Sequence, residues 1–89
     1  MSAARHPVDD LRGWRLRLAA AHAYGCTDYF SFDPWVLFIE HADVMERWGA
    51  LWVVYVRMPE KIAGLTNWMG GNGGDPLEAC LRAFVKSRR

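Results

Sequence analysis

Cysteine and histidine are the side chains of this 89-residue chain best suited to chemistry. His22 and Cys26 stand four positions apart, and on a continuous helix this spacing would aim two ligands at one metal ion. A thiol beside an imidazole, Cys26 or Cys80 with His22 or His41, could form a nucleophilic site. However, Gly25 favours a helix end inside the first pair, and Cys80 falls on the apolar stripe of a predicted helix, where burial leaves a thiol unreactive. We therefore expect no metal ion, no cofactor and no catalytic residues, and so not an enzyme.

A glycine-rich segment, residues 70–74, directly precedes the last predicted helix. Glycine loops at helix N-termini can hold phosphate groups on free backbone N–H groups. Here no Lys-Ser or Lys-Thr pair follows, so the segment is not a P-loop. Asp75 also places a negative charge at the helix start, and Pro76 removes one N–H donor. We predict a flexible connector and not a phosphate site.

Basic residues, almost all of them arginines, form two clusters. Such clusters can bind the phosphates of a nucleic acid, and a neighbouring aromatic ring can stack on a base. The net charge is only +1, which excludes a strongly acidic DNA mimic and gives no general attraction to nucleic acid. Nucleic-acid binding is therefore an alternative function. Its candidate residues are Arg5, Arg12, Arg15 and Arg17 in the first cluster and Lys86, Arg88 and Arg89 in the second.

Five tryptophans are more than a core of this size requires, although an aromatic-rich core is expected. Trp35, Trp48 and Trp68 fall at the edges of predicted elements, where one side of the ring would stay in water. Tryptophan and arginine are typical of the residues that dominate protein interfaces. With Arg47 and Arg57, these three tryptophans form the predicted protein-binding surface.

Residues 7–24 are predicted to form one helix, with Pro7 in its first turn and Gly25 after its end. An apolar stripe at helical spacing should face the core: Val8, Leu11, Trp14, Leu18, Ala21 and His22.

Short strands should follow at residues 29–32 and 35–40, separated by Asp33-Pro34. Residues 42–48 are predicted to form either a single helical turn or a wide loop. Residues 50–58 are predicted to form the central strand, and because both of its faces are apolar we expect cover on both sides. Residues 64–69 should form a weaker last strand.

The final helix carries the clearest signals, with Asp75 as its N-cap, Pro76 at its first position and Glu78 in the capping box. Its buried stripe should be Leu77, Cys80, Leu81, Phe84 and Val85, while Arg82, Lys86, Arg88 and Arg89 should face outward. The chain as a whole, residues 1–89, is predicted to be a single α+β domain: helix, three- or four-stranded mainly antiparallel sheet, helix. The helices can share one face of the sheet, but the doubly apolar central strand favours three layers.

The stretch WGALWVVYV (residues 48–56), the glycine-rich segment and DPLEACLRAF (residues 75–84) resemble the second half of small phage and prophage proteins called phage ABA-sandwich or NinX-like proteins. The resemblance covers about the last 42 residues. It implies an accessory protein of a phage or mobile element, and small proteins of this origin include anti-CRISPR and other anti-defence inhibitors, which act by binding. No catalytic residue is carried over with it.

We therefore expect a non-enzymatic interaction module, plausible as a phage-encoded inhibitor of a bacterial defence complex. The alternatives are nucleic-acid binding and a phage structural or self-assembling protein. A location in the cytoplasm of a bacterial host is expected, because no secretory leader or membrane-spanning run is visible and two cysteines are too few for a disulfide framework. The expected partner is a bacterial host protein, with a homo-oligomer also open.

Overall fold

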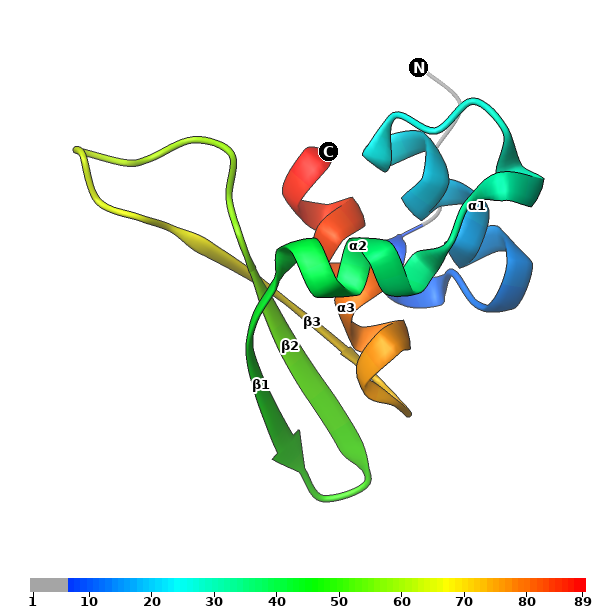
Figure 1. The fold of residues 1–89 in the computed structure, drawn as a ribbon. Coiled ribbons are helices and arrows are strands. Elements are labelled where there is room, and N and C mark those ends of the chain that lie inside the picture. Colours follow the sequence, from blue (N-terminus) through cyan, green and yellow to red (C-terminus); the bar gives the residue numbers. More distant parts are fainter. Residues whose placement is uncertain (1–6) are drawn as a thin grey trace, which may run out of the picture.

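The structure, a computed structural model, describes residues 7–89. A 3-10 turn (Val8–Asp10) leads into helix α1 (Gly13–Tyr24), and a second 3-10 turn (Tyr29–Ser31) leads into helix α2 (Pro34–His41). Three strands follow, β1 (Ala42–Trp48), β2 (Leu51–Arg57) and β3 (Trp68–Gly73), and then helix α3 (Pro76–Arg88) (Figure 1). All strand pairs are antiparallel, so the predicted α+β class with a C-terminal helix is confirmed.

Helix α3 lies between the sheet and the other two helices. One of its sides packs on β2 and β3, and the other packs on α1 and α2, so that all three helices lie on the same side of the sheet (Figure 1). The central place of the strand predicted at residues 50–58 is confirmed by the strand order β1-β2-β3. The expected cover on both faces, and with it the preference for three layers with the sheet in the middle, is wrong. The second apolar face of β2 is left at the surface.

The glycines of β3 allow α3 to lie directly on the sheet. A Cβ atom added to Gly71 would stand 2.3 Å from the backbone nitrogen of Ala83 and 2.5 Å from the carbonyl oxygen of Ala79. Helix and strand backbones are thus in contact, and no side chain larger than hydrogen fits between them. The expected flexible connector is therefore wrong, because Gly70, Gly71 and Gly73 belong to a hydrogen-bonded strand.

The N-terminus of α3 is capped as its sequence predicts. The Asp75 side chain accepts a hydrogen bond from the backbone N–H of Glu78 (2.8 Å), and Glu78 Oε1 accepts one from the backbone N–H of Gly74 (3.0 Å). These bonds satisfy donors that a helix N-terminus leaves free.

Arg82 is the exception to the predicted outward-facing residues of α3, because it is only 4% exposed. Its guanidinium donates to the carbonyl oxygens of Asn72 (2.8 Å) and Leu11 (3.0 Å) and to Glu78 Oε1 (3.0 Å). It therefore ties α3 to β3 and to the segment before α1. These partners hold Arg82 in its buried position. They lie on other segments, so the helical periodicity of α3 alone could not reveal them.

The helix predicted over residues 7–24 is interrupted at Leu11 and Arg12, which are extended. This break turns the Leu11 carbonyl toward Arg82 and changes the buried stripe of α1. Leu16, which the predicted stripe omitted, is buried, whereas Trp14 is 62% exposed and His22 is exposed as well.

Two predicted strands are helical in the structure. Tyr29–Ser31 of the first predicted strand form a 3-10 turn, followed by Phe32 in an extended conformation. Residues 35–40 lie in α2, where Asp33 caps the helix by accepting from the Trp35 N–H (3.0 Å) and Pro34 lies in the first turn. Residues 42–48, expected to be a helical turn or a loop, form β1 and pair with β2. Most side chains of α2 are of types that favour strands, but packing selects the helix, because Leu37 is completely buried there.

The β2–β3 connection projects from the sheet (Figure 1). The strand predicted at residues 64–69 begins only at Trp68, and before it Ile62 and Leu65 exchange two backbone hydrogen bonds around Ala63 and Gly64, which both have positive φ. No helix within residues 7–89 is long and apolar enough to cross a membrane.

The buried core is mainly aliphatic, which corrects the expected aromatic-rich core. Only Phe32 and Phe84 among the aromatic residues are buried, and the core is otherwise built from side chains such as Leu16, Leu37 and Val54. None of the five tryptophans is buried.

Candidate protein-binding surface

The alternation of β2 defines two faces of the sheet. Val54 and Val56 are 0% exposed beneath α3, so Val53 and Tyr55 point to the opposite side. The strand register adds residues of the neighbouring strands to that side. We call this side the outer face; its side chains are Val44, Glu46 and Trp48 of β1, Leu51, Val53, Tyr55 and Arg57 of β2, and Trp68 and Asn72 of β3.

Large apolar side chains of the outer face are open to solvent. Trp48 is 64% exposed, Leu51 48%, and Val44 and Trp68 45% each. No helix of the described chain packs on this face. Contiguous apolar surface of this kind on a small domain is typical of an interaction site.

Asp43 connects two residues of the outer face. A register shift between Ala42 and Val44 makes Asp43 a bulge residue, and its carboxylate accepts from Trp68 Nε1 (2.5 Å) and from Arg57 Nε (3.2 Å). The hydrogen bond from Trp68, followed by that from Arg57, lowers the pKa of Asp43 from its ordinary value. The network holds one tryptophan and one arginine in fixed orientations, which reduces the entropy lost when a partner binds.

A hollow of about 400 Å³ lies on the outer face and is lined by Val44, Glu46, Tyr55, Asn67 and Trp68. Gly70 lies under Tyr55, and a Cβ atom at Gly70 would stand 3.0 Å from Tyr55 Cε1. The glycine thus leaves room for the tyrosine ring across β3. The hollow is large enough to receive an apolar side chain of a partner.

The predicted binding residues divide between three places. Trp48, Trp68 and Arg57 come together on the outer face. Arg47 is on the opposite side of β1, where its guanidinium lies 5.7 Å from the Trp52 ring centre and its Nε donates to the Gly49 carbonyl (3.1 Å).

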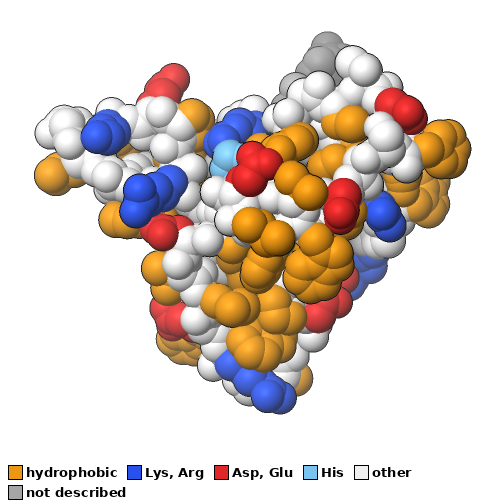
Figure 2. Space-filling model, in the orientation of Figure 1, with side chains coloured by type: hydrophobic (Ala, Val, Ile, Leu, Met, Phe, Trp, Pro, Cys, Tyr) orange, Lys and Arg blue, Asp and Glu red, His pale blue; other side chains and the backbone are white. Residues whose placement is uncertain are grey.

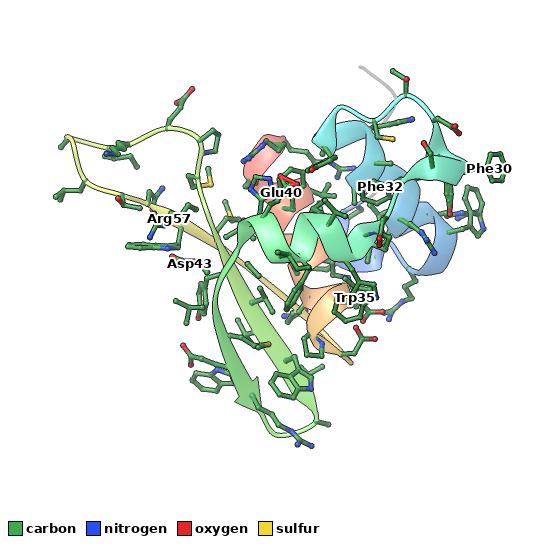
Figure 3. All side chains as sticks on the ribbon, viewed as in Figure 1. Phe30, Phe32, Trp35, Glu40, Asp43 and Arg57 are labelled. Carbon is green, nitrogen blue, oxygen red and sulfur yellow. The ribbon has the colours of Figure 1, made fainter. Side chains whose placement is uncertain are left out.

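Trp35, 53% exposed, lies on α2, away from Asp43 and Arg57, which are side by side near the start of β1 (Figure 3). Val36 and Ile39 of α2 are exposed as well. Figure 2 shows hydrophobic side chains gathered over α2 and the hairpin of β1 and β2. This is a second apolar surface, on the helical side of the molecule.

The predicted set did not include Val44, Leu51 and Tyr55 of the outer face, nor the bulge residue Asp43 that connects two of its residues. Residues 42–48 do not alternate strictly between apolar and charged side chains, so no period-two signal shows β1 and its outward side chains.

The two predicted basic clusters lie at opposite ends of parallel helices. One hollow beside the N-terminal ends of α1 and α3 is lined by residues including Arg17 and Glu78, and another beside their C-terminal ends by residues including Ala23 and Arg88. Lys86 is paired with Asp9 (2.9 Å), and Arg88 stacks on Phe84 at 4.5 Å. Arg5 lies outside the described residues.

The candidate chemical residues are dispersed. Cys80 is 0% exposed, and burial raises the pKa of its thiol to about 12. Helix α1 ends at Tyr24, before Cys26, whose Sγ donates to the Asp28 carbonyl (3.1 Å). Burial, and then the charge of Arg88, lowers the pKa of His41. Over residues 7–89 no group of three or more His, Cys, Asp or Glu side chains is arranged to hold a metal ion.

Comparisons with protein-family models, with curated proteins and with solved structures return no match. The resemblance to phage ABA-sandwich or NinX-like proteins therefore stays a prediction.

Proposed function

We propose that this protein is a non-enzymatic protein-interaction module that binds its partner through the outer face of the sheet. The observation that carries the proposal is the exposure of Trp48 and Trp68 on a sheet face that no helix within residues 7–89 covers. Exposed tryptophan in water is costly for a monomer, and burying it against a partner recovers roughly 25 cal/mol for each Å² removed from water.

The chemistry of the face supports the same function. It combines large rigid rings, a hollow and an arginine, which are the groups that dominate protein interfaces. A phage-encoded inhibitor of a bacterial defence complex is one specific form of this proposal, and its support is the sequence resemblance together with the small size of the chain.

The test compares two variants of the tagged protein in capture experiments from nuclease-treated bacterial lysate. Trp48→Ser with Trp68→Ser removes both rings of the outer face. Trp14→Ser is the matched control, because Trp14 is 62% exposed but lies on α1. We expect a protein captured in stoichiometric amounts by the wild type and by the control, and lost from the double variant. Circular dichroism checks that all three are folded.

Equal capture by the double variant would contradict the proposal. Captured material that disappears with nuclease would instead favour nucleic-acid binding.

A further inference from the structure

Strand β1 is at the edge of the sheet, and its free edge is open. It pairs with β2 on one side, and on the other side no strand of residues 7–89 pairs with it. Every residue from Asp43 to Trp48 is exposed, so no helix or loop of the described residues covers the edge. An open edge presents unpaired backbone N–H and C=O groups that can pair with another strand.

Two adjacent charges on β1 have no oppositely charged partner among the described residues. Glu46 accepts a hydrogen bond from Trp48 Nε1 (3.1 Å), and Arg47 stacks on Trp52; neither forms a salt bridge. Consecutive residues of a strand point to opposite faces, so Glu46 and Arg47 cannot pair with each other. The edge thus displays one unpaired charge of each sign, one on each face.

Charge argues against a second copy of β1 as the added strand. A two-fold antiparallel pairing centred on Glu46 or on Arg47 places like charges directly opposite each other. A pairing centred on Met45 places Arg47 opposite Asp43 of the second copy, but that carboxylate is already paired with Arg57 and hydrogen-bonded to Trp68. The same pairing leaves the two Glu46 side chains as diagonal neighbours, roughly 7–8 Å apart. A strand of a different protein can carry the complementary charges instead.

We propose that β1 binds an extended segment of the partner protein as a fourth, antiparallel strand. The segment presents an acidic residue opposite Arg47, a basic residue opposite Glu46 and an apolar residue opposite Met45, in that order along its chain. This inference rests on the proposed function and specifies how the partner is recognised. The partner strand forms backbone hydrogen bonds with the edge of β1 and ion pairs with Glu46 and Arg47 on the two faces of the sheet.

Two fluorescent nine-residue peptides test the proposal. One has the sequence Thr-Thr-Ile-Glu-Lys-Leu-Ile-Thr-Thr, and the other has the same composition with the Glu and Lys exchanged. The protein variant Glu46→Arg with Arg47→Glu keeps the net charge and changes only exposed side chains. Fluorescence anisotropy measures affinity, and amide hydrogen exchange over residues 43–48 locates the bound peptide.

We expect the Glu-Lys-Leu peptide to bind the wild type about tenfold more tightly than the exchanged peptide, because two cross-strand ion pairs become two repulsions. The preference should reverse in the double variant, and exchange over residues 43–48 should slow. Equal affinities, a preference that the variant does not reverse, absence of binding to either peptide, or a dimer in light scattering that the variant abolishes would each overturn the proposal.

The result is distinguishable from a failure of the proposed function. Partner capture that depends on Trp48 and Trp68 but is unchanged in the Glu46→Arg, Arg47→Glu variant would overturn the added strand alone.

Discussion

The two faces of the sheet belong to the same three strands, but one is buried under α3 and the other is exposed to solvent. On the inner face, Gly71 has no side chain, so that the backbone of α3 can lie against β3, and Val54 and Val56 fill the remaining space. On the outer face, two of the three tryptophans of the sheet, Trp48 and Trp68, remain in water. The difference shows that stability depends on the inner face, while the outer face is free to carry recognition. Substitutions on the two faces should therefore have effects of very different size.

The largest effect is expected for Gly71→Val. Its side chain would overlap the backbone of Ala79 and Ala83, so α3 must move away from β3, and the free energy of unfolding should fall by about 3 kcal/mol or more. Asn72→Val is the matched control, because Asn72 is the next residue of β3 and points to the outer face; its effect should stay within about 0.5 kcal/mol. Urea denaturation measures both. Similar losses in the two variants would refute the contrast between the faces.

A second comparison uses two paired arginines. Arg82→Met removes three hydrogen bonds at a side chain that is 4% exposed, and should cost about 2–3 kcal/mol of stability. Arg57→Met removes the pair with Asp43 at a side chain that is 67% exposed, and should cost less than about 1 kcal/mol. Thermal unfolding of both variants measures the two losses of stability. A larger loss from Arg57→Met than from Arg82→Met would contradict the expectation that the buried arginine contributes more to stability.

The smallest effect is expected for the pH dependence of the stability that Asp43 contributes. Because hydrogen bonds from Trp68 and Arg57 lower the pKa of Asp43 in the folded protein, this carboxylate stabilises the fold above its unfolded pKa of roughly 3.9, and the contribution is lost as the pH falls through the folded value. Asp43→Asn should be less stable than the wild type at pH 7, and the difference should shrink below about pH 4. Denaturation curves from pH 7 to pH 2 measure this difference, and a constant difference would show that the charge of Asp43 has no role.

The helices illustrate where sequence reasoning succeeded and where it did not. Asp33-Pro34 and Asp75-Pro76 are the same capping signal, and both start helices. The second was recognised because an amphipathic pattern follows it. The first was interpreted as a strand boundary because the next five residues are aromatic, β-branched or otherwise apolar, and only packing of Leu37 against the core selects the helix.

The candidate surface was predictable by residue type but not by place. Trp48, Trp68 and Arg57 could be selected because of their side chains, but their shared face depends on the register of β1 with β2 and of β2 with β3. The same register separates Arg47 from them. Asp43 could not be predicted from the sequence for the same reason, since its role arises from a bulge that forms only when β1 pairs with β2.

The position of α3 has a consequence for how the chain becomes folded during synthesis. The helix that contacts the sheet, α1 and α2 is the last described element to leave the ribosome. Until then, the sheet and helices α1 and α2 lack the helix that packs between them. The Leu11 carbonyl likewise lacks its hydrogen-bond donor, because Arg82 is 71 positions further along the chain. Folding is thus expected to begin only near the completion of this segment and to depend on contacts distant in sequence, a topology that slows folding and lengthens the exposure of nascent chains to chaperones.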